Sequence, residues 1–293
     1  MNGPPPITGT TRLAAVIGHP VAHSLSPALH NAAFRAAGAD WVYAAFDVAP
    51  GEAARALEAM RVLGLGGLSV TMPHKEDVAA AVDACTPAAR SLASVNTVVR
   101  LPDGRLEGHS TDGDGFVASL REAGCEPAGR RFAVLGAGGA ARAVIDALAR
   151  ERAAQIVVVN RTPARAEQAA ALAGAVGSVG DPLDVADVDV IVNATSLGMG
   201  VGRGAGTDVS EVPLPTRLIR PAHVVVDLVY HPLETPLLAA ARAAGAQAID
   251  GLGMLVHQAA LQQQLWRGEL PDTTVMRTAA LDELSARERL PVA

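Results

Sequence analysis

A glycine-rich turn between an apolar strand and a helix constrains the fold of this chain more than any other feature. Arg131 to Leu135 is an apolar run typical of a buried strand, and GAGGAARAVIDALA follows it as a helix start. A second apolar strand, Ile156 to Asn160, comes next. Glycines at 136 and 138, with Ala141, let the backbone approach a pyrophosphate at the helix N-terminus. The sequence therefore predicts a dinucleotide-binding Rossmann unit.

The end of the second strand indicates which dinucleotide is bound. A chain that binds NAD places an acidic residue there for the ribose hydroxyls. This chain has Asn160, Arg161, Thr162 and Arg165. Two arginines without a carboxylate suit a 2′-phosphate, so NADP is favoured over NAD. The alternative is a solvated helix start whose arginines are incidental.

The N-terminal part alternates strands and helices. Strands are expected at Leu13 to Gly18, Trp41 to Phe46 and Gly66 to Thr71, with helices from Ser26 to about Ala37 and from Gly51 to Val62. This rhythm predicts a parallel sheet, and ligands gather outside the carboxyl ends of such strands. The loops HPVAHSLSP and VTMPHK should therefore share one edge.

Two serines lie in the first of these loops. Ser26 precedes Pro27, a combination typical of a helix start. The hydroxyls of Ser24 and Ser26 can face a ligand there, although a capping role for the Ser-Pro pair is the plainer interpretation.

Lys75 is the only lysine in the chain, and the other 23 of its 24 basic residues are arginine. A guanidinium stays charged, whereas an amine can exchange its proton with a substrate. Pro73 ends the preceding strand, so Lys75 should begin the next helical stretch, which is expected to reach about Ala93. We predict an acid/base role for Lys75, against the alternative of a leftover from biased composition.

Three further polar residues are candidates for the site. Segments Ser94 to Leu101 and Arg105 to His109 flank a Pro-Asp-Gly turn and predict a hairpin that carries Asn96. Asn96 is either functional or a satisfied core asparagine, and Asp112 is either functional or a helix cap. Gln258 lies on a long C-terminal helix, where solvent exposure is the default.

The remaining pattern continues the alternation. Val188 to Asn193 and Val224 to Leu228 read as strands, and the loop from Gly198 to Gly206 is a candidate flap or a surface insertion.

Composition bounds the class of protein. A length of 293 residues favours two domains, and a net charge of −6 without basic tracts argues against nucleic acid or an anionic membrane as partner. A small-molecule substrate is expected. Two cysteines and eight scattered histidines give no metal-ligand spacing. With no membrane span or signal pattern, a cytoplasmic location is expected.

Eight motifs occur together in order between Ala15 and about Pro271: GHPVAHSLSP, SVTMPHK, SVNTVVR, STDGDG, GAGGAAR, NRTPAR, NATSLGM and DGLGMLVHQAA. Together they resemble the shikimate dehydrogenase family. The resemblance implies an α/β fold with a substrate domain, 1–111 completed by 252–293, and an inserted NADP-binding Rossmann domain, 112–251. It also implies reversible, NADPH-dependent reduction of 3-dehydroshikimate to shikimate in aromatic amino acid (chorismate) biosynthesis, by a monomer or homodimer.

The same resemblance implies residue roles. Ser24 and Ser26 would hold the substrate carboxylate, Lys75 and Asp112 would form the catalytic pair, and Tyr230 would be a further substrate contact. The groups around the substrate hydroxyls would be Thr71, Asn96, Asp112 and Gln258. The cofactor contacts would be Gly136, Ala137, Gly138, Gly139, Ala140, Asn160, Arg161, Thr162 and Arg165, with Leu228, Gly251 and Met254 near the nicotinamide.

Two positions depart from the family pattern. Ser69 and Ser110 stand where the family often has asparagine. These departures leave quinate and aminoshikimate dehydrogenases, which are close relatives, as alternatives. A non-catalytic NADP-binding regulator is a further alternative, although such a protein should have lost Lys75 or Asp112.

Overall fold

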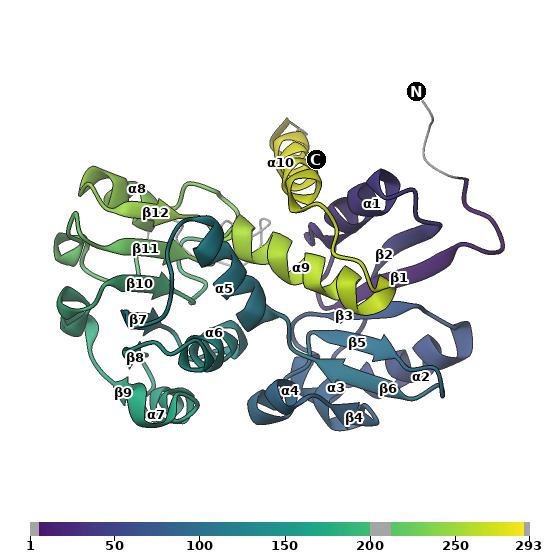
Figure 1. Cartoon of the computed structure of the whole chain (residues 1–293), viewed down its shortest axis with the longest axis horizontal. Helices are drawn as coiled ribbons and strands as arrows, with labels where there is room; N and C mark the ends of the chain where they lie inside the picture. Colours follow the sequence, from purple (N-terminus) through teal and green to yellow (C-terminus); the bar gives the residue numbers. More distant parts are fainter. Residues whose placement is uncertain (1–5, 200–211, 290–293) are drawn as a thin grey trace. The chain divides into compact units, whose positions relative to one another are not determined.

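The chain forms two compact units, each built on its own six-stranded sheet (Figure 1). The structure, a computed structural model, describes residues 6–199 and 212–289. The first unit comprises Met1–Thr111 and Gln258–Ala293, and the second comprises Asp112–His257. The predicted α/β class with two sheets is confirmed. Most of the Gly198 to Gly206 loop lies outside the described residues.

The first sheet has the strand order β2-β1-β3-β5-β6-β4. Its parallel part is β1 (Arg12–Gly18), β2 (Trp41–Asp47) and β3 (Gly67–Val70), joined by the helices α1 (Ser26–Ala36) and α2 (Ala53–Leu63). The predicted βαβαβ unit is therefore confirmed. Parallel pairing places the ends of β1 and β3 side by side, at Ile17 and Val70.

The second part of this sheet is a hairpin. β5 (Thr97–Arg100) and β6 (Leu106–His109) pair antiparallel, as predicted, and β5 pairs antiparallel with β3. The expectation of one helical stretch to Ala93 is wrong. α3 (Lys75–Ala81) and α4 (Pro87–Leu92) are separated by the short strand β4 (Ala84–Cys85), because Thr86 caps a new helix that starts at a proline.

The second sheet is parallel throughout, in the order β12-β11-β10-β7-β8-β9. Its order reverses at the β7–β10 pair, and ligands of such sheets bind at this switch point. The strands are β7 (Arg131–Leu135), β8 (Gln155–Val159), β9 (Gly177–Val179), β10 (Val190–Asn193), β11 (Val224–Asp227) and β12 (Gln247–Ile249). The helices are α5 (Asp112–Glu122), α6 (Gly139–Arg150), α7 (Pro163–Ala171) and α8 (Pro236–Ala243), with 3-10 turns η1 (Gly174–Val176), η2 (Pro182–Asp187) and η3 (Thr216–Leu218).

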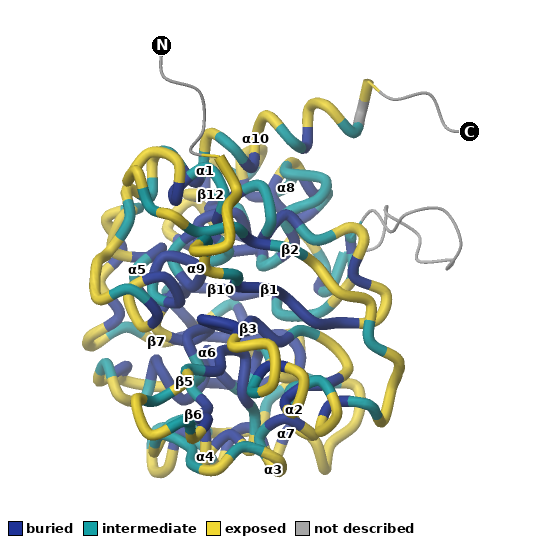
Figure 2. The backbone as a smooth tube through the Cα atoms, turned by 90° about the vertical axis from the view of Figure 1, so that its right-hand side faces the viewer, coloured by how far each residue is buried: buried dark blue, intermediate teal, exposed yellow. Residues whose placement is uncertain are grey.

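Both faces of the second sheet are covered. Along β7, Phe132 and Val134 belong to the core on the α5, α6 and α7 side, and Ala133 and Leu135 belong to the core on the α8 side. Alternating side chains that are apolar on both faces are the signature of a parallel sheet between helices. Figure 2 shows the resulting buried strands and exposed connections.

The last two helices of the described residues are α9 (Leu252–Arg267) and α10 (Thr273–Arg289). The boundary between the two units falls within α9, between His257 and Gln258. From Gln258 onward, α9 and α10 therefore complete the first unit, and α10 lies against α1.

A buried histidine lies in the core of the first unit. His30 stacks on Tyr43 with ring centroids 4.1 Å apart, and the Gln263 amide donates to its Nδ1 across 3.1 Å. Burial lowers the pKa of His30 to about 3. The His30 ring is therefore neutral in the folded protein at neutral pH.

This shift predicts acid sensitivity of the first unit. Below pH 6.5 His30 becomes protonated in the unfolded chain, whereas in the folded chain it stays neutral down to about pH 3. The free energy of unfolding therefore decreases as the pH falls from 6.5 towards 3. The loss between pH 6.5 and 4.5 should be about 2 kcal/mol and should disappear in His30→Asn. Both tryptophans, Trp41 and Trp266, lie in the first unit, so urea unfolding followed by tryptophan fluorescence measures it.

The exposed His23 supplies the control. His23→Asn should keep the pH dependence of the parent chain. An equal pH dependence in the parent and in His30→Asn would contradict the assignment.

Candidate functional site

Backbone hydrogen bonds gather three segments of the first unit at one sheet edge. Thr71 N–H donates to the Ile17 carbonyl across 2.9 Å, so the chain after β3 runs beside the end of β1. Val95 N–H donates to the Lys75 carbonyl across 3.0 Å. The start of α3, which carries Lys75, is therefore fixed beside the residue that precedes Asn96. The predicted shared edge for the two loops is confirmed.

The serine loop is held by a hydrogen bond within the loop and by α10. Ser26 N–H donates to Ser24 Oγ across 3.2 Å, and Leu25, the N-cap residue of α1, makes no side-chain cap. The interpretation in which Ser26 caps the helix is therefore wrong. Arg287 of α10 donates to the carbonyls of His23 and Ser24, across 2.6 and 3.2 Å. These bonds tie the loop to the C-terminal helix.

Asn96 is buried and its side-chain amide has a defined orientation. Its Oδ1 accepts from the Thr111 N–H and from the Thr97 hydroxyl, each across 2.8 Å, and its Nδ2 donates to Thr111 Oγ1 across 2.9 Å. The Asn96 Nδ2 also lies 3.5 Å from Gln258 Oε1. Asn96 and Gln258, two residues predicted from different motifs, are therefore neighbours.

The default of a solvent-facing Gln258 is wrong. Gln258 is only 8% exposed, and Gln262, one helical turn later, donates to its Oε1 across 3.0 Å. Residues four apart share one face of a helix, so the amides of Gln258 and Gln262 lie together on one buried face of α9.

Three residues of this interior were not predicted as site residues. Tyr43 donates to Ser69 Oγ across 2.7 Å, and Ser69 donates to Gln262 Oε1 across 2.7 Å. Burial raises the pKa of Tyr43, and hydrogen bonding to Ser69 and Ser26 opposes this shift. The signals were available, since Ser69 is a polar residue in an apolar strand and Gln262 follows Gln258 by four positions.

The glycine turn of the second unit has the shape that a pyrophosphate needs. Gly136 has φ of 110°, and a Cβ there would lie 3.0 Å from the Ala194 carbonyl oxygen. Around Gly138 and Gly139, a Cβ would meet no described atom within 4 Å, so the start of α6 has space above its backbone. Exposed N–H groups at a helix N-terminus with such space suit an anion.

The segment after β8 carries the predicted ribose contacts. The Asn160 amide donates to the Thr162 carbonyl across 3.0 Å, and α7 starts at Pro163. Arg161 and Arg165 are both exposed and carry the only charges between residues 160 and 165. This arrangement fits a dianionic 2′-phosphate better than a neutral pair of hydroxyls.

A third segment of the second unit borders the end of β11. A Cβ at Gly251 would lie 2.4 Å from the Leu228 carbonyl oxygen, so the two residues are in close contact. Leu228 and Met254 both pack against the core that contains Phe132 and Val134. Asp227 accepts from the Val229 N–H and from Asn193 Nδ2, across 3.1 and 2.8 Å, and burial raises its pKa. These bonds fix the backbone around Leu228.

The predicted catalytic and substrate residues divide between the two units. Ser24, Ser26, Thr71, Lys75, Asn96 and Gln258 belong to the first unit, and Asp112 and Tyr230 belong to the second. Asp112 is the first residue of α5 and follows Thr111, whose N–H orients Asn96.

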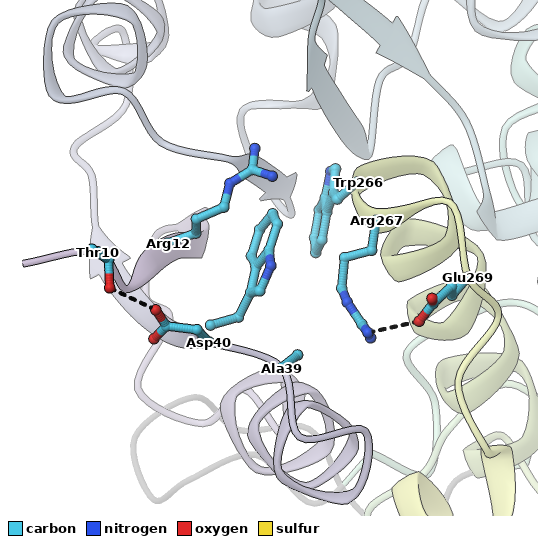
Figure 3. Close-up of a pocket in the computed structure, with 8 residues that line it drawn as sticks. Thr10, Arg12, Ala39, Asp40, Trp266, Arg267 and Glu269 are labelled. Atoms are coloured by element: carbon cyan, nitrogen blue, oxygen red, sulfur yellow. Dashed lines mark hydrogen bonds and ion pairs between the residues drawn. The ribbon is translucent and has the colours of Figure 1, made fainter. Parts of the chain in front are cut away.

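Two cavities of the first unit differ in what lines them. The cavity in Figure 3 has a volume of about 390 Å³. Among the residues that line it, the Thr10 hydroxyl donates to Asp40 across 2.9 Å, and Arg267 forms an ion pair with Glu269 across 3.0 Å. It contains none of the predicted site residues. A cavity of about 730 Å³ along α1 and α10 includes Ser24.

Within residues 6–199 and 212–289, no cluster of three or more His, Cys, Asp or Glu side chains suits a metal ion. No helix in this part of the chain is long and apolar enough to span a membrane.

The Rossmann sheet with its glycine turn, together with a second α/β unit, defines a two-domain protein of the dinucleotide-binding class. Three family models match successive parts of the chain. They are the shikimate dehydrogenase substrate binding domain at residues 16–98, shikimate / quinate 5-dehydrogenase at 121–201, and the shikimate 5′-dehydrogenase C-terminal domain at 251–281.

Full-length relatives agree with these models. The NADP(+) shikimate dehydrogenase of Moorella thermoacetica is 46% identical over 297 residues, with 98% of each chain covered. That of Geobacter metallireducens is 45% identical over 290 residues, covering 95% of this chain and 99% of the relative. Shikimate 5-dehydrogenase from Thermus thermophilus, solved with NADP(H) and shikimate, has a TM-score of 0.85 at 39% identity, covering 92% of this chain and 99% of that one. This chain belongs to the shikimate dehydrogenase family.

The two glycines of the turn should respond differently to alanine. Gly136→Ala forces a side chain into a positive φ and against Ala194, which should lower stability by about 1 to 3 kcal/mol. Gly138→Ala should keep stability within about 0.5 kcal/mol yet weaken NADP binding, because its methyl group occupies the space above the helix start. Thermal unfolding by circular dichroism and NADP titration measure the two effects. Equal melting of Gly136→Ala and the parent would contradict the close approach.

Proposed function

We propose that this chain catalyses the reversible, NADPH-dependent reduction of 3-dehydroshikimate to shikimate, in aromatic amino acid (chorismate) biosynthesis. The observation that carries the proposal is the placement of the only lysine. Lys75 opens α3, and its carbonyl accepts from the N–H of Val95, the residue that precedes Asn96. Reduction of a polyhydroxylated ketone requires an amine that exchanges protons and hydrogen-bonding groups that hold the hydroxyls.

The two parts of the chain have separate tasks. Residues 1–111, completed by 252–293, form the substrate domain, and residues 112–251 form the NADP-binding Rossmann domain. The enzyme acts as a monomer or homodimer on a small molecule, without nucleic acid or membrane partners. A cytoplasmic location suits two free thiols, Cys85 and Cys125.

The cofactor is NADP, and when bound it supplies hydride to the carbonyl carbon. Gly136, Ala137, Gly138, Gly139 and Ala140 hold the pyrophosphate at the start of α6. Arg161 and Arg165 bind the 2′-phosphate, with Asn160 and Thr162 at the ribose. Leu228, Gly251 and Met254 border the nicotinamide, on a backbone that Asp227 fixes.

Substrate recognition draws on several of the motifs. The hydroxyls of Ser24 and Ser26 hold the carboxylate. Tyr230 is a further contact, and the groups around the substrate hydroxyls are Thr71, Asn96, Asp112 and Gln258. Because the Ser24 loop is bound by Arg287, the carboxylate contacts are held in place before substrate arrives.

Lys75 transfers the proton. In reduction its ammonium donates to the developing oxyanion at C3, and in the reverse direction the neutral amine accepts the hydroxyl proton. Asp112 orients the amine. Both residues are retained, which disfavours a non-catalytic NADP-binding regulator.

A panel of substrates and cofactors tests the function. The absorbance of the reduced nicotinamide cofactor should show the fastest turnover with shikimate and NADP, and slower turnover with quinate, aminoshikimate or NAD. If quinate with NAD is the best pair, the specificity proposed here is wrong. Tight NADP binding without turnover of any of the three substrates would instead favour the regulator.

Substitution of Lys75 separates charge from proton transfer. Lys75→Arg keeps a cation but cannot release a proton, so both Lys75→Arg and Lys75→Ala should lower kcat by about 100-fold or more. The KM for shikimate should change far less. Near-normal kcat in Lys75→Arg would show that charge alone matters and would remove the acid/base role.

A further inference from the structure

The backbone carbonyl of Asn96 determines the orientation of Gln262. The side-chain nitrogen of Gln262, Nε2, lies 3.3 Å from this carbonyl, which only accepts hydrogen bonds. The donating end of the amide must therefore face Asn96, and its second hydrogen is directed to Gln258 Oε1 across 3.0 Å. Gln262 is 2% exposed, so no bulk water competes for these bonds.

The other end of the same amide fixes the direction of a hydroxyl chain. Because Gln262 Oε1 accepts, Ser69 donates to it, and Tyr43 in turn donates to Ser69, both across 2.7 Å. Tyr43, Ser69 and Gln262 form a buried chain of hydrogen bonds with a single direction. We refer to these three residues as the Gln262 relay.

The Gln262 relay determines the orientation of the Gln258 side-chain amide. Gln258 Oε1 receives Gln262 Nε2, and Asn96 Nδ2 lies 3.5 Å from it on another side. The orientation of Asn96 is set independently, because Thr111 N–H can only donate and is bound to Asn96 Oδ1. Two backbone groups therefore lead to the same orientation of the Gln258 amide.

We propose that Gln262 and Ser69 are positioning residues, which hold Gln258 so that its amide nitrogen is the group that meets the substrate. This inference rests on the proposed function and on the contact of Gln258 with a substrate oxygen. A donor can bind the hydroxyl of the reduced substrate and equally a ketone oxygen, whereas an amide oxygen can bind only a hydroxyl. The orientation therefore keeps Gln258 useful in both directions of a reversible reaction.

The relay also accounts for Ser69, which stands where the family often has asparagine. At this position a hydroxyl both accepts from Tyr43 and donates to Gln262 within a short distance. The serine is therefore matched to the glutamine at 262 in this chain.

Steady-state kinetics of Gln262 variants test the proposal. Gln262→Leu removes both donors and should raise the KM for shikimate about tenfold, with the KM for NADP within about twofold of the parent. Gln262→Glu keeps the size but places an acceptor against the Asn96 carbonyl and Gln258 Oε1, so its effect should be at least as large. Ser69→Ala should raise the KM for shikimate about threefold.

A double-mutant cycle separates positioning from general destabilisation. In a Gln258→Ala background, Gln262→Leu should change the KM for shikimate by less than about twofold, because the residue it positions is absent. Equal effects in both backgrounds would overturn the proposal. Gln264→Leu, at an exposed position of the same helix, is the matched control and should behave as the parent.

The outcome can be told apart from failure of the proposed function. A parent chain without turnover of shikimate would refute the function. Turnover in the parent together with an unchanged KM in folded Gln262→Leu would refute only the positioning role. If Gln262→Leu does not fold, the near-isosteric Gln262→Met gives the same test, with tryptophan fluorescence reporting the first unit.

Discussion

The main chain of Asn96 is the point on which the first unit depends. Its carbonyl accepts from the Val70 N–H across 2.8 Å and from Gln262 Nε2 across 3.3 Å, and so joins β3 to α9. Its N–H donates to the His109 carbonyl across 3.1 Å and joins the hairpin. A sheet edge, a hairpin and a returning C-terminal helix therefore meet at one residue.

Such a junction is stable only when its polar groups are paired. Leaving one buried donor or acceptor unpaired costs about 1 to 3 kcal/mol, a large share of the stability of a domain. Tyr43, Ser69, Asn96, Gln258 and Gln262 are all buried, and each has a hydrogen-bond partner. The same pairing that stabilises the unit gives its side chains one orientation, which is what substrate recognition needs.

The second unit achieves its precision through the backbone. A parallel sheet covered on both faces aligns the carboxyl ends of its strands, and the turns at Gly136 and Gly251 bring main chain against main chain. Asp227 and Asn193 bind the chain after two neighbouring strands. A dinucleotide site built from backbone groups tolerates wide changes in sequence, whereas the substrate site proposed for the first unit depends on particular side chains.

The sequence by itself determined the fold class, most strands and the family, because strand periodicity, glycine turns and ordered motifs are local signals. It also singled out Lys75, through composition alone. Only the tertiary structure showed that Gln258 is buried and that Ser69 and Gln262, 193 positions apart, share a hydrogen bond. It also showed that the stretch expected to be one helix before Ala93 is two helices separated by a short strand, and that Ser26 does not cap α1 with its side chain. These features depend on which distant groups pair once water is excluded, and no local pattern in a chain records that choice.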